Sequence, residues 1–133
     1  MRIRTNPASW KDRRHRLGVD GEELAKEFLQ RRGWQILDHR FTMGRLEIDL
    51  VARLGTIVAF VEVKTRLSRT FGSPLEAVTR GKQRDIARVA QAWLDRHGRP
   101  HDVYRFDVIG IERIRRGHLR VMHVEDAFKA GWR

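Results

Sequence analysis

The sequence predicts a single α/β domain in which helices flank a central β-sheet. Two segments with apolar residues at helical spacing alternate with runs rich in β-branched and aromatic residues, in the order helix, three strands, helix, two strands. The length of 133 residues fits one domain and leaves little room for a second. The same order of elements also fits an α+β arrangement around one sheet.

The first predicted helix ends at Gly33, a residue type that commonly closes helices. Its apolar residues keep helical spacing and would form one face: Leu24, Ala25, Phe28 and Leu29. Two capping patterns compete at its start, Asp20 with Glu23 and Ser9 with Asp12. The helix therefore begins either near residue 20 or near residue 10.

Three strands are expected after this helix, over residues 34–41, 45–52 and 57–64. The last two would form a hairpin whose tip lies at Leu54-Gly55. Residues 65–78 are rich in Ser, Thr, Gly and Pro, which predicts a loop.

A second helix is expected over residues 81–98, where apolar residues again recur at helical spacing. Two strands follow, over residues 103–112 and 119–125, with a basic turn between them. The last residues, 126–133, are expected to form a short helical turn.

The chain is strongly basic, with 28 Lys and Arg against 17 Asp and Glu and a net charge of +11. This excess favours an anionic partner, of which the nucleic-acid backbone is the commonest, although the charge could also serve solubility alone. Residues 1–16 form a basic N-terminal arm, and residues 17–133 form the domain. The arm either binds phosphates or is a solvated tail.

The absence of cysteine excludes disulfides, thiolate zinc sites and a cysteine nucleophile. It is compatible with a cytoplasmic protein. The basic start of the chain is not followed by an apolar run, so no signal peptide is expected. No apolar stretch approaches the ~20 residues of a membrane helix, and no membrane partner is expected.

Every ionic residue inside the predicted hairpin strands falls on one face, because successive strand residues point to opposite faces. If an even number of residues connects the strands, Phe60 lies opposite Asp49 and Glu62 opposite Glu47. The charged face then holds Glu47, Asp49, Glu62 and Lys64. The opposite face is apolar and would be core: Ile48, Leu50, Ala52, Ile57, Ala59, Val61 and Val63.

Like charges that lie opposite each other destabilise a strand pair, and a divalent cation, proton sharing or basic neighbours would offset that cost. As diagonal neighbours, Asp49 and Glu62 could share one hard cation, Mg²⁺ or Mn²⁺. Lys64 could position or deprotonate a water, or stabilise charge on a phosphate. Such a set suits metal-assisted hydrolysis of phosphodiesters. The simpler alternative is that Glu62 and Lys64 pair with other surface charges.

Six segments carry a resemblance that spans roughly residues 17–112. GEELA, EIDLVA, VAFVEVKTR, FGSPLEAV, GKQ and RFDVIGI occur in the order found in the YraN-like family of small bacterial proteins. Asp49 followed by Glu62-Val63-Lys64 resembles the PD-(D/E)xK nuclease core. The resemblance implies a restriction-endonuclease-like fold, with a central mixed sheet flanked by helices, similar to that of archaeal Holliday-junction resolvases.

The resemblance also implies roles for particular residues. Asp49 and Glu62 match metal-binding carboxylates, Lys64 matches the catalytic lysine, Glu22 matches a further acidic metal ligand, and Gln83 matches a residue that supports the lysine or the substrate. Glu47 belongs to the family motif as an acid outside the ligand set. Ile48 stands where the signature has proline, and Leu46 where the family commonly has glycine, which affects the backbone near Glu47.

These features together predict a Mg²⁺- or Mn²⁺-dependent nuclease that acts on DNA, including branched or flapped forms. The alternatives are a nucleic-acid-binding module of the same fold without useful catalysis, and an interaction protein whose acids form a structural ion network. The expected phosphate contacts are Arg66, Arg69, Arg80, Lys82 and Arg84. The resemblance is compatible with a homodimer, because cutting both strands of a symmetric junction needs two sites. Asp107 is left outside the catalytic set.

Overall fold

The computed structural model describes residues 2–7, 21–66, 78–115 and 118–129. In this part of the chain, six strands form one mixed sheet in the order β1-β6-β5-β4-β3-β2. The strands are β1 (Arg2–Pro7), β2 (Gln35–Met43), β3 (Leu46–Leu54), β4 (Ile57–Arg66), β5 (Val103–Arg115) and β6 (His118–Phe128). β4 and β5 are parallel, and the other neighbours are antiparallel.

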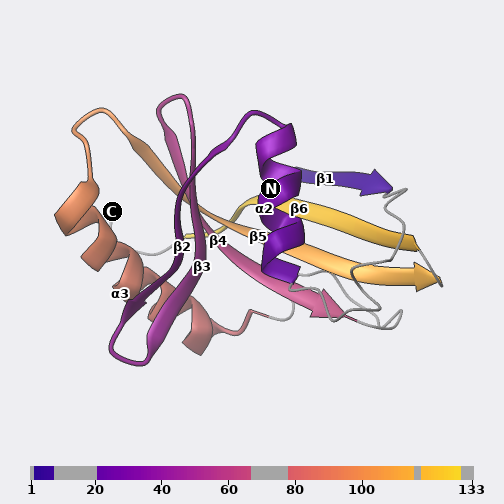
Figure 1. The fold of residues 1–133 in the computed structure, drawn as a ribbon. Helices are drawn as coiled ribbons and strands as arrows, with labels where there is room; N and C mark the ends of the chain where they lie inside the picture. The colour runs from indigo at the N-terminus through magenta and orange to yellow at the C-terminus, as the bar shows by residue number, and fades with distance from the viewer. Residues whose placement is uncertain (1, 8–20, 67–77, 116–117, 130–133) are drawn as a thin grey trace.

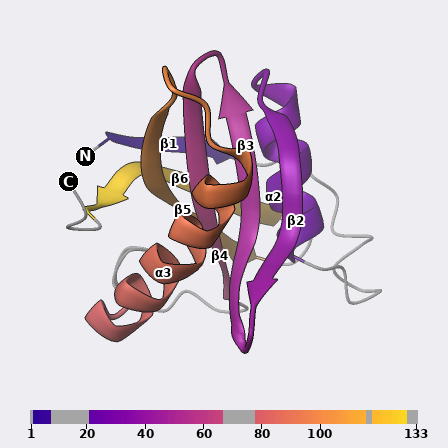
Figure 2. The ribbon, with the colours of Figure 1, turned by 90° about the vertical axis from the view of Figure 1, so that its left-hand side faces the viewer.

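Two helices, α2 (Gly21–Arg31) and α3 (Arg80–His97), cover opposite faces of the sheet (Figures 1 and 2). α3 lies between β4 and β5 in the sequence, as a crossover between parallel strands requires. The predicted α/β class is therefore confirmed, and so is the predicted order from the first helix to the last strand, whereas β1 before that helix was not predicted. None of the helices in these described ranges is both long and apolar enough to span a membrane.

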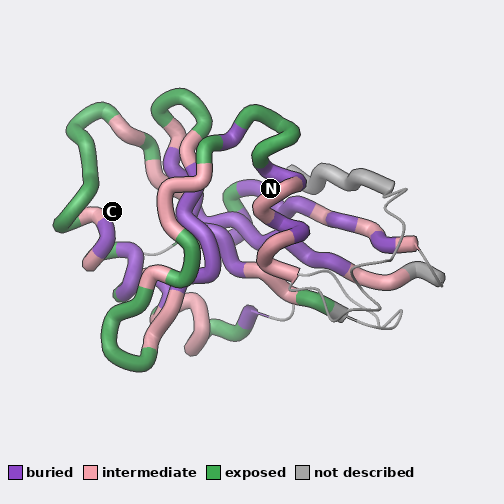
Figure 3. Tube along the Cα trace, viewed as in Figure 1, coloured by how far each residue is buried: buried purple, intermediate pink, exposed green. Residues whose placement is uncertain are grey.

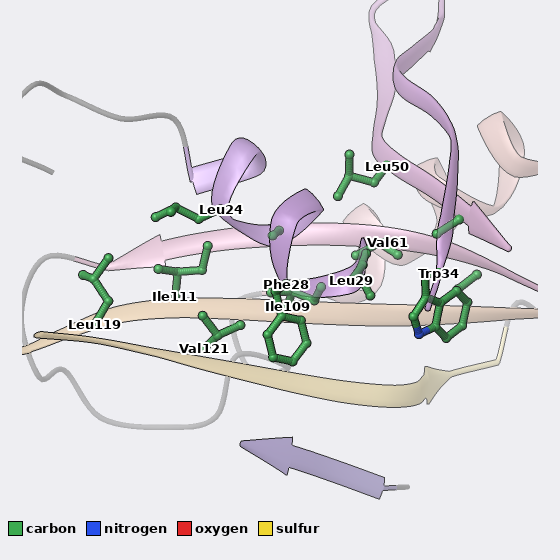
Figure 4. Close-up of a cluster of buried hydrophobic side chains, with 13 residues drawn as sticks. Leu24, Phe28, Leu29, Trp34, Leu50, Val61, Ile109, Ile111, Leu119 and Val121 are labelled. Atoms are coloured by element: carbon green, nitrogen blue, oxygen red, sulfur yellow. The ribbon is translucent and has the colours of Figure 1, made fainter. Parts of the chain in front are cut away.

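The apolar face of α2 packs on the middle of the sheet. Phe28 and Leu29 are at most 1% exposed and lie in one cluster with residues of β5 and β6, such as Ile109 and Val121 (Figure 4). The helix is closed by Gly33 at a φ of 91°, as its residue type predicted. This packing fixes where the first residue of the helix, Gly21, meets the sheet.

The other face of the sheet is covered by α3, whose residues Ile86, Val89 and Trp93 pack against Val58 and Phe60 of β4. The central strands are therefore buried on both faces, whereas the hairpin tips are exposed (Figure 3). The prediction that only one face of the hairpin is core was wrong. A short apolar run does not reveal whether one or two layers will cover it.

The β3–β4 hairpin turns at Gly55-Thr56, with Leu54 opposite Ile57 and Leu50 opposite Val61. The predicted tip at Leu54-Gly55 was wrong, and so was the register, by two residues. Gly55 has a φ of 63°, the left-handed conformation that glycine adopts without strain. The connection still has an even number of residues, so a shift of two preserves which residues share a face.

One residue departs from the predicted faces. Ile48 packs in the α3-side cluster instead of with Leu50 and Ala52, which lie in the α2-side cluster. The pairing of β3 with β4 ends at Leu50–Val61, so Ile48 lies in the part of β3 that pairs with β2 alone.

The ends of the domain also differ from expectation. Residues 2–7 of the predicted arm pair with β6 as β1, while residues 8–16 lie outside the described ranges. β6 continues through Phe128, so the helical turn expected from residue 126 was wrong for residues 126–128. Strands β5 and β6 extend into the expected basic turn, and most of the expected loop, residues 67–77, lies outside the described ranges.

Candidate metal centre

The acids of interest lie where β3 and β4 separate. The ladder between these strands ends at the pair Leu50–Val61, after which β4 stays beside β5 and β3 stays beside β2 (Figure 1). At the point of separation, Oδ2 of Asp49 accepts a hydrogen bond of 2.7 Å from the Val63 N–H. The side chain of Asp49 thus takes the place of a backbone partner for β4.

Asp49 and Glu62 meet at this fork. The observed register, continued by one pair, sets them directly opposite each other, closer than the predicted diagonal arrangement. Asp49 is 9% exposed and Glu62 is 4% exposed. Burial and the negative charge of Glu62 raise the pKa of Asp49 from 3.8 to about 7, while the Val63 N–H acts in the opposite direction.

Two further carboxylates complete the cluster. One carboxylate oxygen each from Glu22, Glu47 and Asp49 lies within 4.8 Å of the other two. Glu22 comes from the first turn of α2, and Glu47 comes from β3 two residues before Asp49. Glu47, which the resemblance implied to be an acid outside the ligand set, therefore lies as close as the implied ligands.

Gly21 lets α2 approach the fork. A Cβ atom at this position would collide with Oγ1 of Thr65 on β4. Glycine is thus needed where the helix begins, one residue before Glu22.

The two oxygens of Glu62 have different surroundings. Oε2 lies 3.7 Å from Nζ of Lys64 and 3.4 Å from Nζ of Lys82. Oε1 is buried and has no hydrogen-bond partner in the described part of the chain. A buried carboxylate oxygen in this state is costly, and a bound cation would satisfy it.

The other predicted residues are placed less centrally. Gln83 follows Lys82 in the first turn of α3, and its side-chain amide donates a hydrogen bond of 3.1 Å to the Val78 carbonyl. Arg80 and Arg84 are exposed on α3, near its start. Arg66 ends β4, but its side chain is not among those the structure describes, and Arg69 lies outside the described residues.

Two residues of β2 that the sequence did not single out contact the cluster. Nε2 of His39 and Nε of Arg40 lie 2.8 Å and 2.9 Å from Oε1 of Glu22. Arg40 has a φ of 58°, an uncommon conformation for a residue with a side chain. No local pattern relates residues 39 and 40 to residue 22, so the sequence offered no signal for this contact.

Asp107 belongs to a different network. Its carboxylate accepts hydrogen bonds from Arg105 Nε at 3.0 Å and from the Asp126 N–H at 3.0 Å, and Nε2 of His123 is 2.7 Å away. These contacts use both oxygens of Asp107, which is consistent with leaving it out of the catalytic set.

The donor set fits a hard divalent cation. Carboxylate oxygens are the ligands that Mg²⁺ and Mn²⁺ prefer, and Glu22, Glu47 and Asp49 present three of them from two elements. Glu62 is not part of this group of three, but it lies opposite Asp49 across the fork, where its negative charge raises the pKa of Asp49.

The regions that match known sequences include all residues of this site. The model of the "Uncharacterised protein family UPF0102" matches residues 21–111. A UPF0102 protein of Chlorobium chlorochromatii is 47% identical over 84% of this chain and 90% of its own length. A UPF0102 protein of Symbiobacterium thermophilum is 44% identical over 86% of this chain and 98% of its own length. A third UPF0102 protein, from Rhodococcus jostii, is 43% identical over 84% of this chain and 95% of its own length.

Proposed function

This chain belongs to the uncharacterised protein family UPF0102, and we propose that it is a Mg²⁺- or Mn²⁺-dependent nuclease that hydrolyses phosphodiester bonds of DNA. One observation carries the proposal: Glu22, Glu47 and Asp49 converge where β3 and β4 separate, and Glu62, opposite Asp49, has Lys64 and Lys82 beside it. A binding module would need basic residues at such a place and would have no use for buried carboxylates.

Glu22, Glu47 and Asp49, with Glu62 beside them, would hold a divalent ion, which would supply a Lewis acid for the reaction with water. The protein's own groups supply the rest. Glu62 holds the ammonium group of Lys64 at the site, where it stabilises negative charge on a phosphate. Only the neutral amine of Lys64, after loss of its proton, would accept a proton from water. The Val63 N–H holds Asp49 in place from β4.

The polyanionic substrate is supported by charge. The chain carries +11 overall, and Arg80, Lys82 and Arg84 lie in the first turns of α3, where Nζ of Lys82 is 3.4 Å from Oε2 of Glu62. Contacts from such residues go to phosphates and carry little base information. The expected specificity is therefore for the shape of the DNA, such as a branch or a flap, and two copies would be needed to cut a symmetric junction.

Cleavage of end-labelled DNA tests the proposal. The substrates are duplex, single-stranded, flapped and four-way-junction DNA, each incubated with Mn²⁺, with Mg²⁺ or with a chelator. The wild-type protein is expected to cut at least one substrate only when metal is present. Glu62→Gln is expected to bind the same substrate and leave it uncut.

Glu22→Gln and Glu23→Gln provide a matched pair of neighbours on α2. Glu22 lies in the acid cluster, whereas Glu23 pairs with Lys26 on the surface. Loss of cleavage in Glu22→Gln alone would support the assigned site. Binding of every substrate without any cut would instead identify a nucleic-acid-binding module, and absence of binding at low salt would leave the acids as a structural ion network.

A further inference from the structure

A cavity of about 420 Å³ lies at the end of α2 away from the acid cluster. Glu22 is in the first turn of this helix, and Arg31 is its last residue. With a rise of ~1.5 Å per residue, the two sites are separated by the length of the helix, roughly 14 Å. The cavity is lined by charged groups from three elements, among them Arg31, Arg105 and Glu125.

Two arginine side chains at the cavity lie over aromatic rings. The Arg32 guanidinium lies over the Phe28 ring at 4.5 Å, and the Arg105 guanidinium lies over the Trp34 ring at 5.3 Å. Arg105 is also held by Asp107 through two hydrogen bonds of 3.0 and 3.1 Å. A guanidinium fixed in this way is preorganised to bind an oxyanion.

The arginines at the end of α2 are not needed to cap it. The carbonyls of Leu29 and Gln30 already accept hydrogen bonds from the backbone N–H groups of Arg32, Gly33 and Trp34. The helix end contributes roughly half a negative charge, whereas Arg31 and Arg32 contribute two full positive charges. At the cavity, the guanidinium groups of Arg31, Arg32 and Arg105 outnumber the carboxylates of Glu125 and Asp107, both of which pair with Arg105, so a net positive charge remains.

His123 supplies an independent sign of a ligand. Its side chain is 1% exposed and lines the cavity, and its Nε2 lies 2.7 Å from Oδ2 of Asp107. Its other ring nitrogen, Nδ1, is buried and has no hydrogen-bond partner in the ranges the structure describes. Buried polar atoms in this state are rare in folded proteins unless a ligand or water satisfies them.

We propose that this cavity binds the phosphate of a nucleotide, with the phosphate on the arginines and the nucleoside against the apolar wall. That wall consists of Trp34, Leu54 and Ile57, and the Glu125 carboxylate at the cavity lies 3.6 Å from Nη2 of Arg105. The volume lies within the range of about 300–1,000 Å³ that is typical of small-molecule sites and exceeds the needs of phosphate alone. The nucleotide comes either free from solution or as the phosphorylated end of a strand.

Calorimetry in a chelating buffer tests this site apart from the metal centre. The probes are adenosine 5′-monophosphate, adenosine, inorganic phosphate, and one oligonucleotide with either a 5′-phosphate or a 5′-hydroxyl group. The monophosphate or the phosphorylated oligonucleotide is expected to bind about tenfold more tightly than its counterpart without phosphate, and Arg32→Gln is expected to weaken that binding about tenfold. Binding of the free monophosphate would identify a nucleotide from solution as the ligand, and binding of the phosphorylated oligonucleotide would identify the end of a strand.

Two control variants separate this site from the rest of the protein. Arg88→Gln removes an exposed arginine of α3, on the opposite face of the sheet, and Glu62→Gln removes a carboxylate of the metal centre. Neither is expected to change the affinity for the phosphate-bearing probe. Equal binding with and without phosphate, or an Arg32→Gln variant that binds like the wild type, would overturn the proposal.

Discussion

The carboxyl group of Asp49 is expected to be protonated when no cation is bound and ionised when a cation is bound. Without a cation it lies against Glu62 in a buried position, and the pKa of Asp49 rises to about 7. Near neutral pH a proton or a metal ion must therefore compensate the two acids. The same feature makes the site detectable through the pH dependence of stability.

In the presence of a chelator, the free energy of unfolding is expected to fall as pH rises from about 4 through about 7. The folded protein retains the Asp49 proton over this range, whereas the unfolded chain, with a pKa near 3.8, has released it. One retained proton gives a slope of at most about 1.4 kcal/mol per pH unit. Urea unfolding measured across this range checks the slope.

Asp49→Asn removes the titrating group and is expected to flatten the dependence in the same urea experiments. Asp95→Asn is a surface control, because Asp95 accepts a hydrogen bond from Gln91 on the exposed side of α3. An Asp49→Asn variant with the same pH dependence as the wild type between about pH 4 and pH 7 would contradict the raised pKa of Asp49.

The two lysines at Oε2 of Glu62 are expected to differ in function. Lys64→Met should lower the rate of DNA cleavage by about 10²- to 10⁴-fold, since a positioned acid–base or charged group contributes this much. Lys82→Met should lower it about tenfold or less, because Lys82 lies on α3 and not on the strand that carries Glu62. Single-turnover cleavage rates check the difference, and equal losses would assign both lysines the same function.

At the residue scale, the sequence was informative wherever chemistry followed from strand alternation. The charges at positions 47, 49, 62 and 64 fall on one face whichever even register is chosen, so the acidic cluster could be predicted. The contacts of His39 and Arg40 with Glu22 could not, because they depend on a positive φ at Arg40 and on where α2 meets β2.

At the scale of elements, the close approach of α2 to β4 depends on Gly21. Gly21→Ala is expected to lower the free energy of unfolding by about 1–2 kcal/mol, because the new Cβ would collide with Thr65 Oγ1. The shift of α2 should also weaken Mn²⁺ binding, since Glu22 follows directly. Thermal unfolding and calorimetry measure the two effects.

The double variant Gly21→Ala, Thr65→Ala removes the colliding atom and should recover most of both losses. Gly81→Ala is a matched control, because its Cβ would make only ordinary contacts of 3.8 Å or more in the first turn of α3. It should leave stability unchanged or raise it by about 1 kcal/mol. A double variant no better than Gly21→Ala would show that the collision is not the cause.

An ion pair ties β3 to the segment that leads into β5. Arg53 donates two hydrogen bonds of 2.8 Å to the Asp102 carboxylate, and both side chains are largely buried. Asp102→Asn is therefore expected to lower the free energy of unfolding by about 2 kcal/mol, and Asp95→Asn should change it little. Urea unfolding at neutral pH provides the comparison, and equal effects of the two variants would rule out a special role for the pair.

The elements themselves could be predicted because apolar periodicity is a local property, and both helices and five strands lie close to the predicted ranges. The separation of β3 from β4 could not be predicted. It arises because β4 continues beside β5 while β3 continues beside β2, and these pairings join residues far apart in the sequence. The site lies at that separation, which is why the sequence placed Asp49 and Glu62 diagonally.

For the whole molecule, the net charge of +11 predicts DNA binding that weakens steeply with salt. Arg84→Gln is expected to reduce the slope of log K against log salt by about 0.9 on duplex DNA, the effect of losing one phosphate contact. Lys129→Gln is the control, because Lys129 follows the last residue of β6 and pairs with Asp126. Fluorescence anisotropy at several salt concentrations gives both slopes, and equal slopes for Arg84→Gln and the wild type would place the DNA elsewhere.

The central claim is that the acids between β3 and β4 hold one divalent cation, and calorimetric titration with Mn²⁺ tests it most directly. The wild-type protein is expected to bind one Mn²⁺ ion at this site, and the Asp49→Asn, Glu62→Gln double variant is expected to lose that binding while remaining folded. Equal affinity in the two proteins would contradict the claim.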